Sequence, residues 1–170
     1  RVDINQPVDK KTDTLKDITR IKGCVPTIQE LSDKGAKLVI LAHQGSDIEY
    51  HNYYNLSPHA KVISELINKK VEFIPDVCGP YAQNKIRNMK EGEIILLDNV
   101  RFMAEEMTLF ETKLNLSVEQ MKQTQVVKKL SPLADLFVVD AFAAAHRAQP
   151  TLMGFCYNLK SAMGRLFELE

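Results

Sequence analysis

The feature that most constrains this chain is an alternation of short apolar, β-branched runs with longer segments of helical spacing. Such alternation predicts β-α-β units, in which each helix returns the chain so that successive strands lie parallel. The runs are nearly continuously apolar, as expected for strands covered on both faces. We therefore predict an α/β fold, a doubly wound Rossmann-like domain with a mainly parallel sheet in three layers (αβα). The predicted strands are Val2 to Asn5, Ala36 to Ala42, Val71 to Ile74, Glu93 to Leu97 and Leu136 to Val139.

Helical periodicity fills the segments between these strands. The first helix covers Ile18 to Leu31, and Gly35 stands where a glycine commonly ends a helix. Ser57 is interpreted as an N-cap, with Pro58 as the first residue of the second helix. Residues 102–116 are mixed in character and give no prediction. The further predicted helices are one after Gly79-Pro80, one from Ser117 to Leu130 opened by a capping box of Ser117 with Gln120, and one from Leu159 onward.

Composition limits the classes of partner. A length of 170 residues with 45% hydrophobic content predicts one domain over residues 1–170. The 22 basic and 22 acidic side chains cancel, which argues against nucleic-acid or anionic-membrane partners. No apolar run approaches the roughly 20 residues that span a bilayer. Three cysteines without a CxxC pair favour a reducing, cytoplasmic setting, and Cys24 is interpreted as an inert core thiol.

Polar and cationic residues follow four of the predicted strands. In open α/β sheets, ligands bind beyond the carboxyl ends of the strands. Arginine offers a planar fork for carboxylate or phosphate, and each charge-assisted hydrogen bond contributes about 1.5 to 3 kcal/mol. We predict a site for a small anion, against the alternative of ordinary solvated loop charges. The residues are Asp3 and Asn5, His43-Gln44-Gly45, Asp98-Asn99-Val100-Arg101, and Asp140 followed by His146-Arg147.

Other candidate sites are weaker. His43, His51 and His59 are evenly spaced, but they fall on a polar loop and near a helix start, so no metal site is predicted. Glu105 and Glu106 are interpreted as a solvated face, because adjacent residues do not point together on a helix. The seven glycines form neither GxGxxG nor GxxxxGK[ST]. ATP is therefore not the predicted ligand of this chain.

These motifs resemble the phosphoglycerate kinase family, and the His-Gln-Gly and Leu-Asp-Asn-Val-Arg variants resemble its archaeal branch. The order and spacing of the motifs run through nearly all 170 residues. The matching segments are Arg1-Val2-Asp3-Ile4-Asn5-Gln6-Pro7, Thr19-Arg20-Ile21 with Pro26-Thr27-Ile28, Lys34-Gly35-Ala36-Lys37, His43-Gln44-Gly45, Asp98-Asn99-Val100-Arg101-Phe102, and Asp140-Ala141-Phe142 with Ala145-His146-Arg147-Ala148.

The resemblance implies a two-domain enzyme that moves a phosphoryl group between ATP and the carboxylate of 3-phosphoglycerate, giving 1,3-bisphosphoglycerate. It implies that this chain is the N-terminal domain, which holds 3-phosphoglycerate. The C-terminal domain, which holds Mg-ATP or Mg-ADP, would be its partner and is absent from this chain. Because Arg1 to Asn5 are interpreted as the end of a strand, we expect the chain to belong to a longer protein. Because it has no phosphate loop for a nucleotide, we expect it to be inactive alone.

The resemblance also implies roles for individual residues. Arg20 would be the catalytic residue, facing the transferring phosphoryl group and neutralising charge on its equatorial oxygens. The implied substrate-binding residues are Asp3 and Asn5 for the carbon backbone, His43, Arg101 and Arg147 for the anionic groups, His146 lining the pocket, and Gly45 with Ser46 in the adjoining loop.

The chain departs from the family pattern after Gly45. The family usually continues with Arg-Pro, and that arginine helps to bind the phosphate, whereas this chain has Ser46-Asp47. We expect weaker phosphate binding unless another basic group substitutes. A milder departure is Ala143-Ala144-Ala145 in place of Gly-Thr-Ala. Two alternatives stay open: a stand-alone receptor for a small phosphorylated or carboxylated metabolite, and a purely structural or interaction domain.

Overall fold

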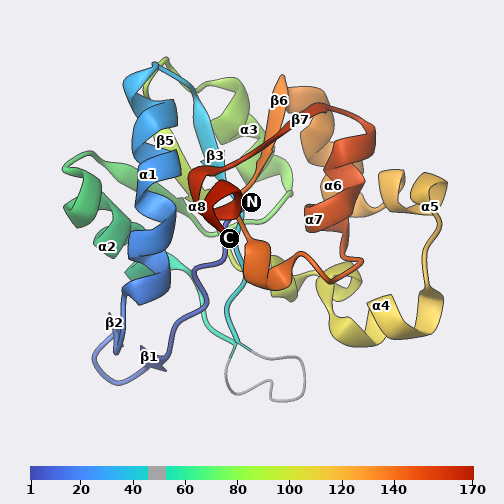
Figure 1. Cartoon of the computed structure of the whole chain (residues 1–170), viewed down its shortest axis with the longest axis horizontal. Helices are drawn as coiled ribbons and strands as arrows, with labels where there is room; N and C mark the ends of the chain where they lie inside the picture. Colours follow the sequence, from blue (N-terminus) through green and yellow to red (C-terminus); the bar gives the residue numbers. More distant parts are fainter. Residues whose placement is uncertain (46–52) are drawn as a thin grey trace.

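A three-stranded parallel sheet forms the centre of the molecule (Figure 1). The computed structural model describes residues 1–45 and 53–170. Strand β5 (Ile94–Leu97) lies between β3 (Leu38–Ile40) and β4 (Val71–Ile74) and is parallel to both. All four β5 residues are buried. The predicted strands at these three places are therefore confirmed, β4 over the full predicted range and β3 in a shorter form.

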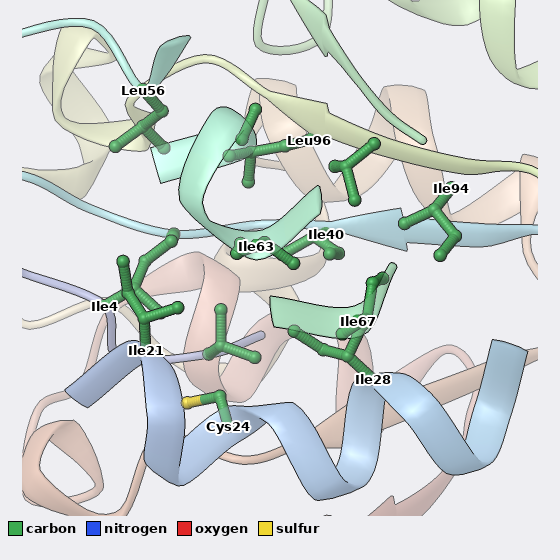
Figure 2. Close-up of a cluster of buried hydrophobic side chains, with 14 residues drawn as sticks. Ile4, Ile21, Cys24, Ile28, Ile40, Leu56, Ile63, Ile67, Ile94 and Leu96 are labelled. Carbon is green, nitrogen blue, oxygen red and sulfur yellow. The ribbon is translucent and has the colours of Figure 1, made fainter. Parts of the chain in front are cut away.

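Two apolar cores cover the two faces of this sheet. Ile94 and Leu96 belong to the first core, whereas Ile95 and Leu97 belong to the second. Because successive strand residues point to opposite faces, a continuously apolar strand supplies both cores. The first core is completed by α1 (Thr19–Asp33) and α2 (Ser57–Ile67), as Figure 2 shows, and the second by α3 (Pro80–Arg87) and α6 (Gln125–Leu130). The predicted αβα layering is confirmed.

The amino-terminal segment is not the strand predicted over Val2 to Asn5. Only Val2 forms a bridge, parallel to Asp140, and its N–H donates to Leu41 O at 3.0 Å. The N–H of Asn5 instead donates to the side chain of Asp3 at 3.2 Å, and that of Gln6 to Gln44 Oε1 at 3.0 Å. Side chains thus take the hydrogen bonds that a strand ladder would use, and the chain leaves the sheet.

The carboxy-terminal segment also differs from its prediction. Strand β6 (Leu136–Val139) is confirmed, but it pairs in parallel with β7 (Lys160–Met163), where a helix was predicted. All four β7 residues are exposed, so the pairing rests on backbone hydrogen bonds with β6 and leaves no apolar pattern in the sequence. Only the short α8 (Arg165–Leu169) is helical. Its Phe167 N–H donates to Asp140 Oδ1 at 3.0 Å.

Helix boundaries follow local hydrogen bonding. At the end of α1, Gly35 has φ +77°, and the N–H groups of Gly35 and Ala36 donate to Ser32 O and Leu31 O. This is a Schellman arrangement, and it confirms the predicted helix end. Ser57, however, is the first residue of α2 and not its N-cap. That position is occupied by Leu56, whose N–H donates to the Asp98 side chain at 3.2 Å.

The helix predicted over Ser117 to Leu130 is divided into α5 (Val118–Lys122) and α6. The capping box of Ser117 with Gln120 is present and confirmed. The division is stabilised by Glu105, whose carboxylate accepts from the N–H groups of Gln125 at 2.9 Å and Val126 at 2.7 Å. A carboxylate at a helix N-terminus pairs orphan donors and complements the helix dipole.

Shorter elements complete the fold. The hairpin of β1 (Val8–Asp9) and β2 (Thr14–Leu15) was not predicted. No helix in the described part of the chain is long and apolar enough to cross a membrane. The remaining elements are η2 (Val100–Phe102), η3 (Ala104–Glu106), α4 (Thr108–Leu114), η4 (Ser131–Leu133), η5 (Phe142–Ala144), α7 (Pro150–Met153) and η6 (Gly154–Tyr157).

Candidate functional site

The loop that follows β3 is held by one buried asparagine from the end of β5. Asn99 Oδ1 accepts from Gln44 N at 3.0 Å, and Asn99 Nδ2 donates to Gln44 O at 2.8 Å. The same amide group donates to Tyr54 O at 3.0 Å. Asn99 is fully buried. The buried Asn99 side chain pairs with both the N–H and the C=O of Gln44, so the backbone of Gln44 has little freedom to move. The end of β5 therefore fixes the positions of His43 and Gly45 on either side of Gln44.

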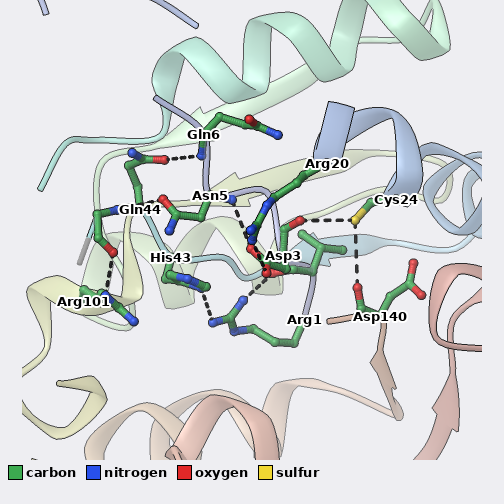
Figure 3. Close-up of polar contacts among 12 residues, drawn as sticks. Arg1, Asp3, Asn5, Gln6, Arg20, Cys24, His43, Gln44, Arg101 and Asp140 are labelled. Atoms are coloured by element: carbon green, nitrogen blue, oxygen red, sulfur yellow. Dashed lines mark hydrogen bonds and ion pairs between the residues drawn. The ribbon is translucent and has the colours of Figure 1, made fainter. Parts of the chain in front are cut away.

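Arg101 lies beside this loop. Its backbone N–H donates to Asn99 Oδ1 at 3.1 Å, and its guanidinium donates to Gly45 O at 2.5 Å (Figure 3). Gly45 has φ +93°, a conformation that favours glycine, and this turns its carbonyl toward Arg101. Arg101 is only 6% exposed. The ends of β3 and β5 therefore form one rigid unit that carries a buried cation.

Asp3, Asn5 and Arg20 reach the same place from the amino-terminal segment and α1. Asp3 Oδ2 accepts from Arg20 at 2.7 Å, and Asn5 Oδ1 accepts from Gly45 N at 3.0 Å. The Arg20 side chain remains 51% exposed, whereas that of Asp3 is buried. Arg20 is thus oriented by a carboxylate at one side and stays open to solvent at the other.

His43 is a neutral hydrogen-bonding group at the centre of this cluster. Burial lowers its pKa well below the ordinary value, and the positive charges of Arg1, Arg101, Arg147 and Arg20 lower it further. Arg1 Nη2 lies 2.8 Å from His43 Nδ1. Because a guanidinium only donates, Nδ1 is the acceptor. His43 is therefore uncharged at neutral pH, and the cations around it are arginines.

The loop after β6 is more open than the others. Arg147 is half-buried, and its positive charge helps to lower the pKa of His43, so it belongs to the cluster. His146 is exposed and makes no hydrogen bond or ion pair with the described members of the cluster. Asp140 is buried and, as described above, accepts a hydrogen bond from the N-terminal turn of α8. Ser46 and Asp47 lie outside the described residues, so their predicted effect is not tested.

The interpretation of Glu105 and Glu106 as a solvated face is wrong. Glu105 is 9% exposed and Glu106 is 0% exposed. Glu105 caps α6, and Glu106 accepts from Thr151 N and Thr151 Oγ1, both at 2.7 Å. The partners come from segments 20 to 45 residues away, so the spacing of the two carboxylates carried no information on their burial.

Several residues of the cluster were not predicted. Arg1 has no assigned role in the sequence reasoning, although it opens the first motif that resembles the family, and this was the available signal. Gln44 Oε1 accepts from Gln6 N and from His59 Nε2, which ties the loop to α2. No sequence signal indicated this tie. Cys24 is buried as predicted, and burial raises the pKa of its thiol to about 12.

A cavity of about 510 Å³ lies between β3 and β6, and Arg1 and Asp140 also contribute to its wall. Its lining is mainly apolar and includes Leu38, Ile40 and Phe137. An apolar lining offers few donors to a phosphate or carboxylate, so the strand ends suit an anion better. Within residues 1–45 and 53–170, no three His, Cys, Asp or Glu side chains gather as metal ligands would, and His51 falls outside these ranges.

Comparisons with known proteins identify the family of this chain. The family model for phosphoglycerate kinase matches residues 1–170. The phosphoglycerate kinases of Methanobacterium bryantii and Methanococcus maripaludis are 45% and 46% identical to the chain, cover all of it, and are themselves covered over 40% and 41% of their length. The chain therefore spans about 40% of the length of these curated relatives.

Solved structures give the same result. The crystal structure of the phosphoglycerate kinase from Pyrococcus horikoshii OT3 matches with a TM-score of 0.88 and 42% identity, over 99% of this chain and 40% of that one. The enzyme from Coxiella burnetii matches with a TM-score of 0.72 and 28% identity, over 99% of this chain and 39% of that one. The higher similarity to archaeal proteins confirms the predicted branch. The chain belongs to the phosphoglycerate kinase family.

Proposed function

We propose that this chain is the 3-phosphoglycerate-binding part of a phosphoglycerate kinase, which transfers a phosphoryl group between ATP and the carboxylate of 3-phosphoglycerate. The observation that carries the proposal is the gathering of Arg1, Arg20, Arg101 and Arg147 around the neutral His43. Two anionic groups on one small substrate require several cations at strand ends, and arginine forks suit both carboxylate and phosphate. Family membership supports the same substrate.

In this proposal some residues bind the substrate and Arg20 assists the phosphoryl transfer. Arg101 and Arg147 hold the anionic groups, and His43 contributes a neutral N–H donor rather than a charge. Arg20 is half-exposed and faces the transferring phosphoryl group. The remaining members of the proposed substrate site are Asp3 and Asn5 at the carbon backbone, Gly45 and Ser46 in the β3 loop, and His146 at the pocket wall.

The nucleotide is proposed to bind outside this chain. The sequence has no glycine-rich phosphate loop, so the residues present do not fit Mg-ATP or Mg-ADP. We infer that a second, nucleotide-binding domain of the same protein supplies it, and that the chain alone catalyses no transfer. The relatives leave about 60% of their length uncovered, which is ample for such a domain.

Calorimetry on the isolated chain tests the binding proposal. We expect 3-phosphoglycerate to bind, glycerate to bind at least tenfold more weakly because one charged contact of about 1.4 kcal/mol is lost, and Arg101→Ala to weaken both. Absence of any 3-phosphoglycerate binding would overturn the proposal. Equal binding of many phosphorylated acids would favour the receptor alternative, and turnover with Mg-ATP by the chain alone would contradict the two-domain assignment.

The role of Arg20 is tested in the longer enzyme that contains this chain. A group that neutralises charge only during transfer affects turnover more than ground-state binding. We expect Arg20→Ala to lower kcat by at least about 10³-fold while raising KM for 3-phosphoglycerate much less. Arg20→Lys should rescue only partly, because an ammonium lacks the planar fork. A change confined to KM would make Arg20 another substrate clamp.

A further inference from the structure

A buried line of hydrogen bonds runs behind His43, on the side away from solvent. Glu106 accepts both hydrogen bonds of Thr151, and Thr151 Oγ1 in turn accepts from Arg1 Nε at 3.1 Å. Arg1 Nη2 then reaches His43 Nδ1 at 2.8 Å. Exposure along the line is 0% for Glu106 and Thr151, 6% for Arg1 and 8% for His43. Figure 3 shows its last step, from Arg1 to His43.

The chemistry of the guanidinium fixes the direction of both hydrogen bonds that Arg1 makes in this line. A guanidinium has donors only, so both Thr151 Oγ1 and His43 Nδ1 accept from Arg1. The single hydroxyl hydrogen of Thr151 is then available to the Glu106 carboxylate 2.7 Å away. A neutral imidazole with an accepting Nδ1 carries its hydrogen on Nε2. The network therefore selects one tautomer of His43.

Charge supports the same arrangement. Burial lowers the pKa of Arg1, and the nearby carboxylates of Glu106 and Asp3 oppose this by stabilising the cation. Asp3 also forms an ion pair with Arg20. Of the two carboxylates, Glu106 is the one whose described arginine neighbour is Arg1 alone. A buried cation without a counter-charge is costly. Burial raises the pKa of Glu106 to about 7, so Glu106 supplies this counter-charge in full only above that pH, and its contact with Thr151 places it there.

We propose that Glu106 and Thr151 are positioning residues that hold Arg1 against His43, and thereby keep His43 as a neutral Nε2–H donor for the anionic substrate. Neither residue touches the proposed substrate itself. The proposal rests on the proposed function for the identity of the anion. The geometry of the line is independent of that identity, and it can be tested without any ligand.

Nitrogen-15 NMR of the histidine rings in the ligand-free chain is the decisive measurement. In the unaltered chain we expect His43 Nδ1 to give the signal of a bare nitrogen and Nε2 that of a protonated one. Thr151→Val keeps the shape but removes the hydroxyl, so Arg1 loses an acceptor. We then expect a mixture of His43 tautomers and a His43 pKa closer to 6.5, while Thr151→Ser restores the original signals.

His59 provides the matched control inside the same spectrum. It is also fully buried, and its Nε2 donates to Gln44 rather than contacting Arg1. Its signals should stay unchanged in every variant that folds. His43 signals that remain unchanged in Thr151→Val, with those of His59 also unchanged, would overturn the proposal. A His43→Gln variant assigns the His43 signals.

Glu106→Gln is the second variant, in case Thr151→Val does not fold. The amide has nearly the same shape, but its NH2 group donates to Thr151 Oγ1, where the carboxylate accepted. Thr151 Oγ1 must then accept from both the amide and Arg1, which weakens its hydrogen bond with Arg1. We expect the same tautomer mixture and about tenfold weaker 3-phosphoglycerate binding. Mixed tautomers with unchanged binding would show that Glu106 positions His43, but that 3-phosphoglycerate binding does not depend on the His43 tautomer. An unchanged His43 tautomer would refute the proposed positioning role of Glu106.

Discussion

The ends of β5 and β6 both deliver an arginine to the cluster, yet they hold it very differently. After β5, Asn99 and Arg101 are buried and joined to the neighbouring loop by hydrogen bonds of 2.5 to 3.0 Å. After β6, Arg147 is half-buried and His146 is exposed. The first end is preorganised for binding, whereas the second is more exposed to solvent.

This difference follows from the packing of the two strands. Strand β5 is central, with partners on both sides, so its end is surrounded by the loop after β3 and by the segment before α2. Among the described residues, strand β6 pairs with the exposed β7. The amino-terminal segment meets it at the Val2–Asp140 bridge and through Arg1 N, which donates to Val138 O at 2.7 Å. Preorganised groups bind at less entropic cost than groups that must be ordered first. We therefore expect unequal contributions from the two ends.

Asn99→Ala should give the largest effect, because it breaks the rigid end itself. It removes four hydrogen bonds, to Gln44 N, Gln44 O, Tyr54 O and Arg101 N. Each buried group left unpaired costs about 1 to 3 kcal/mol. We expect urea unfolding to show a loss of at least about 3 kcal/mol, and calorimetry to show at least about 100-fold weaker 3-phosphoglycerate binding.

The control for this variant is Asn88→Ala. Asn88 is exposed at the end of α3, and its side chain contacts only Asn84 among the described residues. It should change the free energy of unfolding by less than about 0.5 kcal/mol. Equal unfolding midpoints for the Asn99 and Asn88 variants would show that the β5 end is not braced by Asn99.

Replacing each arginine separately compares the two ends directly. Arg101→Ala removes a buried, held guanidinium, and we expect about 100-fold weaker 3-phosphoglycerate binding; Arg147→Ala removes a half-buried one, and we expect about tenfold. Arg87→Ala, on the exposed face of α3, is the matched control and should leave affinity unchanged. Calorimetry of the three variants decides. An Arg147 effect equal to or larger than the Arg101 effect would contradict the comparison.

The sequence predicted the layers and most strand positions because apolar periodicity reports burial. It placed Arg101 and Arg147 at strand ends equally well, but it gave no measure of how each is held. That depends on long-range partners such as Asn99 with Gln44, 55 residues apart. The misplaced helix at β7 has the same cause, since β7 is stabilised by backbone pairing that leaves its side chains exposed.

Glu106 links the two strand ends, because it lies in the segment after β5 and accepts hydrogen bonds from Thr151, in the segment after β6. Burial raises its pKa from 4.5 to about 7, although Thr151 and Arg1 act to lower it. Between these two pH values the folded chain holds a proton that the unfolded chain has lost. The free energy of unfolding should therefore fall as the pH rises from 4.5 to 7, and stay level with respect to this group on either side.

Glu106→Gln isolates that contribution, because an amide does not titrate in this range. His43 acts in the opposite sense, since its lowered pKa makes stability fall as the pH drops below 6.5, so both proteins are compared in a His43→Gln background. Urea unfolding at several pH values should then give a difference between glutamate and glutamine that declines from pH 4.5 to 7. A flat difference for Glu106→Gln would mean that its carboxyl group is charged throughout, and that the tie between the two ends is ionic at every pH in the window.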